Sequence, residues 1–214
     1  TIRWHLQQQK ITPLPAASTI HRILKRHGWV IEQPHKRPRS SWKRFQADQP
    51  NETWQLDYSH WYLNNNQRVA ILTIIDDHSR VAYTEVHDDE TAVTAVAVLH
   101  RAVEWFAERG VTIERILSDN GGAYRSFLWR EACEALSITP KRTRPYRPQT
   151  NGKVERFHRT MADGWAYARC YQSEQERRDA LETWLHHYNQ HRPHTACGNQ
   201  PPFSRLTNVS GQYS

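Results

Sequence analysis

The chain has 214 residues, of which 37% are hydrophobic, including 9 Trp, 9 Tyr and 5 Phe, and its formal net charge is +7. This length and apolar content predict one sizeable domain with a small additional module, and they exclude a chain that is disordered throughout. No apolar run is long enough for a membrane span, and the three widely spaced cysteines form no evident disulfide framework, which is typical of the reducing cytoplasm. The chain begins at Thr1 without a signal-peptide pattern, so we expect a further segment upstream.

The charge is unevenly distributed along the chain. Residues 1–50 carry a net charge of +8, residues 51–140 carry −7, and residues 141–214 carry +6. An acidic middle between two basic flanks favours a carboxylate site bordered by surfaces that bind a polyanion. The alternative is a basic protein whose charges are simply solvated.

Residues 1–31 predict two short helices. The first lies around residues 2–9, and the second, "STIHRILKRHG", has Ser18 or Thr19 as its cap and ends at Gly28. Two helices of this kind resemble a partial helix-turn-helix module, in which the second helix enters the DNA major groove. The alternative is a small amphipathic helix whose basic face is exposed to solvent. Three basic side chains lie largely off the apolar face and are candidate DNA contacts: Arg22, Lys25 and Arg26.

Residues 32–50 predict a linker, because they are basic, contain three prolines and show little periodicity. Their basic side chains would follow DNA phosphates while Trp42 and Phe45 stack on sugars or bases, or the whole segment is a solvated linker.

The pattern changes at Thr53, where strands and helices begin to alternate. Three strands come first and two of them can pair as a meander; afterwards helices and strands alternate, which predicts an α/β fold with a mixed sheet over residues 51–205, followed by a tail at 206–214. The expected strands are 53–63, 68–79, 80–87, 113–119 and 138–145, and the expected helices are 91–110, 126–138, 151 to about 171, and a last one capped by Ser173.

Three carboxylates stand out on these elements. Asp57 lies in the middle of the first strand, Asp119 closes the fourth, and Glu155 lies one turn into a helix, with 35 residues between the last two. Phosphodiester chemistry with two metal ions needs several hard oxygen ligands that converge on one point. Each acid also has an ordinary interpretation: Asp57 as a local cap, Asp119 as the start of an Asn-Gly-Gly turn, and Glu155 as a surface partner of Arg159.

Four sequence motifs in order add to this spacing: Trp-x-x-Asp at 54–57, Ser-Asp-Asn-Gly at 118–121, Pro-x-x-x-Gly-x-x-Glu-Arg-x-x-x-Thr at 148–160, and "YNQHRPH" at 188–194. Together they resemble the catalytic core of retroviral integrases and bacterial insertion-sequence transposases, the DDE enzymes with an RNase H-like fold. The basic "STIHRILKRHG" resembles the end of the amino-terminal helix-turn-helix of the bacterial members.

The resemblance implies a five-stranded mixed sheet with flanking helices, and it makes Asp57, Asp119 and Glu155 the catalytic and metal-binding triad. Asp57 would contact two Mg²⁺ ions, which Mn²⁺ can replace, while the other two acids hold one each. The implied reaction is cleavage at the DNA ends of a mobile element and transfer of those ends to target DNA. Family members act as multimers on DNA, so a homo-oligomer in the bacterial cytoplasm, associated with the nucleoid and not with a membrane, is implied.

Basic and polar residues close to the triad in sequence are candidate DNA contacts, since the loop before Glu155 leads into a helix amino terminus that favours phosphate. A solvated basic loop is the alternative. The candidates are Lys141, Arg142, Arg144, Tyr146, Gln149, Lys153, Arg156 and Arg159.

Two other clusters of possible metal ligands are left outside the site. Asp76 and Asp77 belong to a motif that is structural in the family. The histidines at 186, 187, 191 and 194 lack a cysteine or acid to complete a zinc site.

Three further functions compete with the transposase interpretation. A hydrolytic RNase H-like nuclease or resolvase would use water alone, and a strand-joining assay separates it. An inactive, domesticated DNA-binding transposase would bind without chemistry. A plain helix-turn-helix regulator predicts DNA binding that does not depend on Asp119, and it leaves the acidic strand ends unexplained.

Overall fold

The computed structural model describes residues 2–30, 46–62, 68–143 and 151–206. They fall into two compact units: one holds the amino-terminal helices and residues 193–200, and the other holds the sheet and its helices. Most of the predicted linker and all but the first residue of the predicted tail lie outside the described residues. Within the described part of the chain, no helix is both long and apolar enough to cross a membrane.

The amino-terminal module consists of two helices without a buried residue, α1 (Ile2–Gln8) and α2 (Ala17–Arg26). The prediction that Ser18 or Thr19 caps the second helix is wrong. The N-cap is Ala16, and no side chain caps the helix. The predicted end is confirmed, because Gly28 follows with a positive φ of 71° that glycine adopts without strain. The helix-turn-helix assignment stays a prediction. The side chains of Arg22, Lys25 and Arg26 are exposed.

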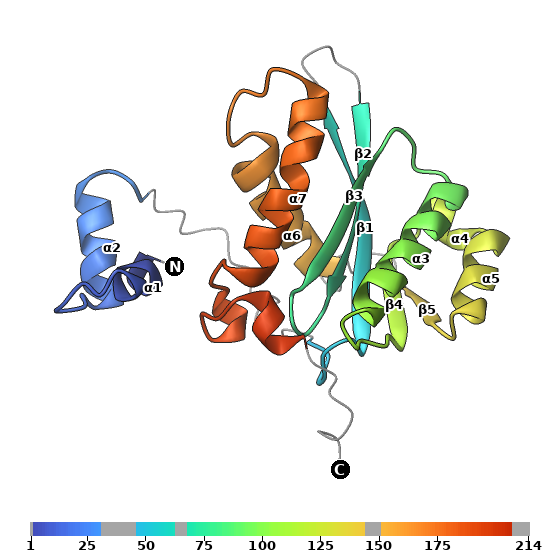
Figure 1. Cartoon of the computed structure of the whole chain (residues 1–214), viewed down its shortest axis with the longest axis horizontal. Helices are drawn as coiled ribbons and strands as arrows, with labels where there is room; N and C mark the ends of the chain where they lie inside the picture. Colours follow the sequence, from blue (N-terminus) through green and yellow to red (C-terminus); the bar gives the residue numbers. More distant parts are fainter. Residues whose placement is uncertain (1, 31–45, 63–67, 144–150, 207–214) are drawn as a thin grey trace. The chain divides into compact units, whose positions relative to one another are not determined.

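A mixed five-stranded sheet forms the centre of the second unit, as the sequence predicts (Figure 1). Its strand order is β3-β2-β1-β4-β5. The first three strands pair antiparallel as a meander, and β4 and β5 run parallel to β1. The strands are β1 (Thr53–Tyr62), β2 (Arg68–Asp76), β3 (Ala82–His87), β4 (Arg115–Ser118) and β5 (Thr139–Arg142).

Helices α3, α5 and α7 begin where a hydroxyl side chain accepts a hydrogen bond from a backbone amide of the first turn. Thr91, Ser126 and Ser173 each cap a helix in this way. The predicted helix from residue 151 to about 171 is wrong in its extent, because the α-helix passes into a π-helical turn at Ala162–Ala166. The helices are α3 (Ala92–Ala107), α4 (Gly122–Arg125), α5 (Phe127–Ala135), α6 (Gly152–Met161) and α7 (Glu174–Gln190), with 3₁₀ turns at Thr195–Cys197 and Pro202–Arg205.

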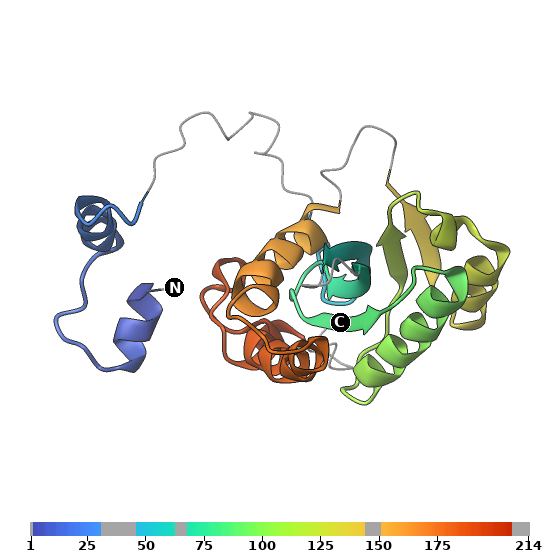
Figure 2. The ribbon, with the colours of Figure 1, turned by 90° about the horizontal axis from the view of Figure 1, so that it is seen from above.

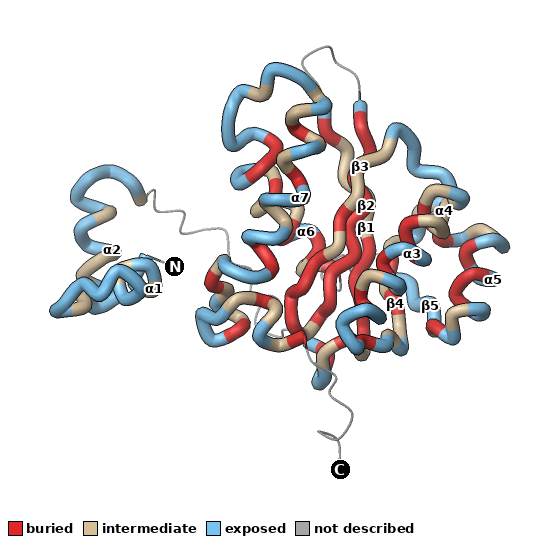
Figure 3. The backbone as a smooth tube through the Cα atoms, in the orientation of Figure 1, coloured by how far each residue is buried: buried red, intermediate tan, exposed pale blue. Residues whose placement is uncertain are grey.

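The helices cover the two faces of the sheet separately (Figure 2). Helices α3, α4 and α5 lie on one side, and α6 and α7 lie on the other. Burial is greatest along β1 and β2, which run between these layers (Figure 3).

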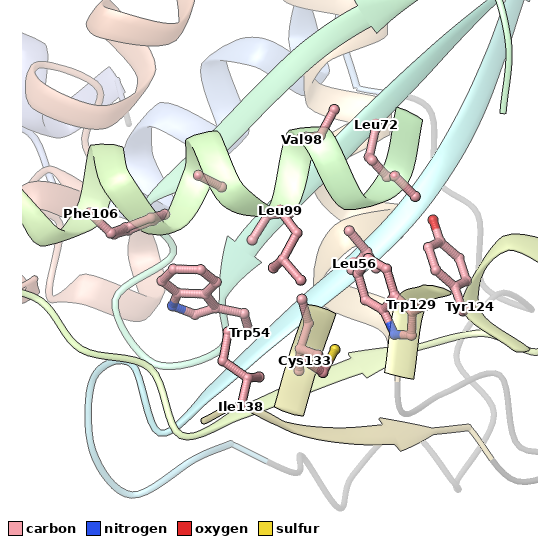
Figure 4. Packing of buried hydrophobic residues seen from close by; sticks show 14 of the residues in the cluster. Trp54, Leu56, Leu72, Val98, Leu99, Phe106, Tyr124, Trp129, Cys133 and Ile138 are labelled. Carbon is pink, nitrogen blue, oxygen red and sulfur yellow. The ribbon is translucent and has the colours of Figure 1, made fainter. Parts of the chain in front are cut away.

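On the α3 side the core is aromatic and aliphatic (Figure 4). The ring centroids of Trp54 and Phe106 are 4.3 Å apart, and Leu99, Trp129 and Cys133 pack in the same cluster.

Side chains on β1 alternate between these two faces, as in any strand. Trp54 and Leu56 belong to the cluster on the α3 side, whereas Trp61 belongs to the cluster that α6 and α7 complete. Residues 55 and 57 therefore face α6. The fold thus turns the candidate catalytic strand position toward the helix that carries Glu155.

Candidate active site

The parallel register of two strands brings Asp57 and Asp119 to equivalent positions. Gln55 on β1 lies opposite Leu117 on β4, and in a parallel pair the residues two positions further along are again neighbours on the same face. Those residues are Asp57 and Asp119. β4 ends at Ser118, so Asp119 is the first residue beyond the strand, whereas the sequence predicts it as the last residue of the strand.

Asp119 also forms the turn that was its alternative interpretation. Its Oδ1 accepts a hydrogen bond from the backbone amide of Gly121 at 2.9 Å. A Cβ at Gly121 would meet the same oxygen at 3.0 Å, so a larger residue there would press on the carboxylate. The turn and the placement of the carboxylate are therefore one feature. It leads directly into the short helix α4, which the sequence analysis missed.

Glu155 reaches the same strand because the start of α6 is bonded to β1. The Gln55 side-chain oxygen accepts hydrogen bonds from the backbone amides of Lys153 at 3.1 Å and Val154 at 3.4 Å. The Asn151 side-chain amide donates to the carbonyl of Leu56 at 3.3 Å. The two bonds to Gln55 satisfy backbone amides of the first helical turn, which have no partner within the helix. They fix α6 against the residues directly before Asp57.

A buried carboxylate, Asp77, supports this docking from behind. Its Oδ1 accepts from the Gln55 side-chain amide at 2.6 Å and pairs with the Lys153 ammonium, while its Oδ2 accepts from the Ala47 amide at 2.7 Å. The Asp77 side chain is fully buried. Burial lowers the pKa of Lys153, and the bond to Asp77 opposes that effect. Lys153, predicted to contact DNA, thus has its ammonium engaged inside the protein.

The electrostatics around Asp57 are those of a carboxylate cluster. The pKa of Asp57 is raised from its ordinary value of 3.8 to about 7, first by burial and then by the negative charges of Asp119 and Glu155, while a backbone hydrogen bond at Tyr58 opposes the rise. The three carboxylates therefore interact electrostatically, as expected for acidic groups that lie close together. Asp57 and Asp119 are partly exposed and Glu155 is exposed. Among the described residues, no ion pair joins Glu155 to Arg159, so the surface-pair interpretation of Glu155 has no support.

This donor set suits a hard divalent cation. Three carboxylates offer oxygen ligands of the kind that Mg²⁺ and Mn²⁺ prefer, and a bound cation would relieve the mutual repulsion that raises the pKa of Asp57. In the part of the chain that the structure describes, no three His, Cys, Asp or Glu side chains are already arranged to hold one ion. The carboxylates would have to draw closer around the metal.

The predicted DNA contacts divide by location. Lys141 and Arg142 are exposed on β5, the edge strand, and Arg156 and Arg159 are exposed on α6. The two α6 arginines line a pocket of about 380 Å³ together with Arg192 and Trp184. Arg144, Tyr146 and Gln149 lie outside the described residues.

Sequence reasoning gave no specific contact to three residues that the structure shows in buried hydrogen bonds. Gln55 stands within the Trp-x-x-Asp motif and Asp77 within the motif expected to be structural, and both make the contacts described above. The third is Asn189 of "YNQHRPH". Its side chain accepts from the backbone amide of Ala82 at 2.9 Å and donates to the Ala82 carbonyl at 2.8 Å, which ties α7 to β3. A buried amide inside an otherwise amphipathic helix was the available signal.

The structural interpretation of Asp76 is confirmed. Its carboxylate is buried and accepts hydrogen bonds from the backbone amides of Asn51 at 2.8 Å and Ser79 at 2.7 Å. It therefore organises the turn after β2.

Comparison with known proteins agrees with this geometry. Two family models, both described as integrase core domain, match residues 47–148 and 136–202. The fold is similar to that of the HTLV-2 integrase catalytic core domain, solved in complex with magnesium, with a TM-score of 0.64 and 18% identity over 76% of this chain and all of that one.

Relatives in sequence come from bacterial insertion elements. The chain is 29% identical over 170 residues to an uncharacterized protein of insertion element IS476 from Xanthomonas euvesicatoria. The aligned stretch covers 79% of this chain and 48% of the relative. It is 25% identical over 213 residues to transposase InsD of insertion element IS2 from Escherichia coli, which covers 92% of this chain and 68% of the relative. The chain thus spans about half the length of the first relative. The resemblance inferred from the sequence is confirmed, and the chain belongs to the family of transposases and retroviral integrases that carry an integrase core domain.

Proposed function

We propose that this chain is the catalytic part of an insertion-element transposase, which cuts DNA at the ends of the element and joins those ends to target DNA. One observation carries the proposal: the β1–β4 register makes Asp57 and Asp119 neighbours, on the strand to which the helix of Glu155 is bonded. The names of the insertion-element relatives support the same activity.

The reaction exchanges one phosphorus–oxygen bond for another. In the first step a water oxygen attacks phosphorus, and the bond to the 3′ oxygen of the element end breaks. In the second step the freed 3′-hydroxyl oxygen attacks a phosphorus of the target strand, and a second 3′ oxygen leaves. No protein nucleophile is required, so Tyr58 and Ser59, although adjacent to Asp57, have no covalent role.

Asp57, Asp119 and Glu155 are the residues that would hold two Mg²⁺ or Mn²⁺ ions. When bound, these ions supply Lewis-acid stabilisation of the attacking and leaving oxygens. The protein's own contribution is placement. Asp57 belongs to a strand of a five-stranded sheet, Asp119 is fixed by its bond to Gly121, and Gln55 fixes the helix of Glu155. Rigid placement of this kind is what catalytic groups need.

DNA would reach the site along basic surfaces. Arg156 and Arg159 lie one residue and one turn beyond Glu155 on α6, with exposed side chains. Lys141 and Arg142 lie on β5, next to β4, the strand that ends one residue before Asp119. In this proposal Arg22, Lys25 and Arg26 of the amino-terminal module bind the element ends. Two ends must be joined in concert, so the protein acts as an oligomer on DNA, in the bacterial cytoplasm.

The test is a strand-transfer assay on labelled DNA that carries the element's own ends, with and without Mg²⁺ or Mn²⁺. The intact chain is compared with Asp119→Asn and with Glu131→Gln. Glu131 is an exposed residue of α5, and its substitution removes one negative charge, as Asp119→Asn does. We expect joined product from the intact chain and from Glu131→Gln, only with metal, and a loss of at least about a thousandfold in Asp119→Asn. Cleavage without joining would instead identify a nuclease. Binding without chemistry would identify an inactive protein or the need for a segment outside this chain.

A further inference from the structure

Arginines in the described part of the sheet domain fall into three groups. Seven pair with a carboxylate, as Arg101 does with Glu85. Two others, Arg80 and Arg205, bond to Gln46 and His78. Six have no carboxylate within ion-pair distance among the described residues, and these six are not scattered.

The six unpaired arginines line two pockets, three in each. Arg156, Arg159 and Arg192 line the pocket on α6 and α7, which belongs to the proposed active-site surface. The other pocket, here called the α4–α5–β5 pocket, has a volume of about 380 Å³ and is lined by Tyr124, Arg125, Trp129, Arg130, Pro140 and Arg142. None of the described residues that line it is acidic.

We propose that the α4–α5–β5 pocket is a second DNA-binding site, which holds backbone phosphates of duplex DNA through Arg125, Arg130 and Arg142. This inference rests on the proposed function, because that function brings DNA to the neighbouring carboxylates. Only Arg142 was a candidate from the sequence. Arg125 and Arg130 are new.

The chemistry of the pocket favours a phosphate ligand. Three guanidinium groups around one hollow repel one another unless an anion lies between them, and the planar guanidinium fork matches phosphate oxygens. Elsewhere in the domain arginines pair with carboxylates, as Arg101 does with Glu85, whereas the three pocket arginines have no carboxylate partner in the described ranges. The Arg130 guanidinium lies 5.6 Å from the centre of the Phe127 ring, a cation–π contact that limits its freedom while leaving its charge exposed.

The position of the pocket favours DNA over another anion. Arg125 ends α4, the helix that begins three residues after Asp119. The floor residue Tyr124 is buried and stacks on Tyr58, the neighbour of Asp57, with ring centroids 6.1 Å apart. A DNA strand with one phosphate at the carboxylates therefore has further phosphates near this pocket. The other arginine pocket is lined by residues of α6 and α7, and these helices lie on the opposite side of the sheet from α4 and α5 (Figure 2).

The experiment measures binding of the full chain to a fluorescent DNA duplex over a range of salt concentrations, with EDTA present so that no chemistry occurs. The variant is Arg125→Gln with Arg130→Gln. The matched control, Arg109→Gln with Arg178→Gln, removes the same charge from arginines that are paired with Glu108 and Asp88. Thermal unfolding confirms that both variants are folded.

We expect the pocket variant to lower affinity at least about tenfold and to reduce the slope of log K against log salt by about two, since each phosphate contact contributes about 0.9. Adding Arg142→Gln reduces the slope by about one more. The control leaves the slope unchanged. Equal losses in the pocket and control variants would show an effect of net charge alone and would overturn the proposal. Competition by polyglutamate as strong as that by DNA would also overturn it, since the pocket would then recognise carboxylates.

Failure of the pocket proposal and failure of the proposed function give different results. Strand transfer by the intact chain with no effect of the pocket variant on DNA binding would reject the pocket and leave the transposase. Pocket-dependent DNA binding without any strand transfer would do the reverse.

Discussion

The two faces of the sheet are built by different means. On the α3 side, Trp54, Leu56 and Phe106 pack in a cluster of apolar side chains. On the α6 side, the strand is joined to the helix through buried polar groups, Gln55 and Asp77, next to a smaller apolar cluster. Apolar packing stabilises a fold without demanding one orientation, whereas hydrogen bonds specify where each group lies. The polar face is the one that places Glu155.

The largest expected loss of stability lies on the apolar face. Phe106→Ala removes a fully buried ring that packs on Trp54, so we expect the free energy of unfolding to fall by about 3–5 kcal/mol. Urea unfolding followed by tryptophan fluorescence measures it. The control is Val93→Ala, an exposed residue of the same helix, which changes stability by less than about 0.5 kcal/mol. A small loss in Phe106→Ala would mean that this face is not the one that stabilises the domain.

Removal of the buried Asp77 charge should destabilise the polar face. Asp77→Ala leaves the Lys153 ammonium and the Gln55 amide without their buried partner, so we expect a loss of about 3 kcal/mol. Asp88→Asn, which removes the exposed partner of Arg178, should cost less than about 1 kcal/mol. Unlike Phe106→Ala, Asp77→Ala should also lower strand transfer under conditions where the variant is fully folded. Unchanged strand transfer would show that the polar face only stabilises the fold.

The comparison also explains what the sequence was able to predict. Asp57, Asp119 and the two strands that place them follow from local patterns: apolar runs, strand ends and the spacing to Glu155. The bonds of Gln55 to Lys153 and Val154 join residues almost a hundred positions apart, and no local pattern contains them. Such pairs become visible only when the fold is known.

The errors at helix ends have the same physical origin. The sequence after Met161 keeps helical propensity, so a longer α6 was predicted. The observed π-helical turn lies where Gly164 packs against α7, and a Cβ there would come within 2.8 Å of the Trp184 indole nitrogen. Tertiary contact overrides local preference at this point. The start of α2 at Ala17, with no side-chain cap, likewise contradicts a rule based on capping residues alone.

Acid should destabilise the sheet domain through His158 of α6. Burial lowers the pKa of His158 to about 4 from its ordinary value of 6.5, and its buried Nε2 has no hydrogen-bond partner among the described residues. Between these values the unfolded chain binds the proton and the folded chain does not. The free energy of unfolding is therefore unaffected by His158 protonation above about pH 6.5. It falls as the pH drops toward 4, and this residue accounts for at most about 3 kcal/mol of the fall.

The measurement is urea unfolding of the intact chain and of His158→Met across this pH range. The difference in unfolding free energy between the two proteins should change with pH between about 6.5 and 4 and be constant above it. A difference that does not depend on pH would show that the folded protein accommodates the protonated imidazole.

The most selective test of the polar face is Gln55→Leu, which keeps the side-chain volume and removes the acceptor for the α6 amides. We expect a modest loss of stability, about 1–2 kcal/mol, as for the loss of a helix cap. The effect on strand transfer should be larger, on the order of tenfold in the rate at saturating DNA, because α6 no longer holds Glu155 in one place. DNA affinity should stay unchanged, since Gln55 is buried and touches no DNA. A drop in affinity at a constant rate would assign Gln55 to DNA binding, and equal small losses of stability and rate would reduce it to an ordinary structural residue.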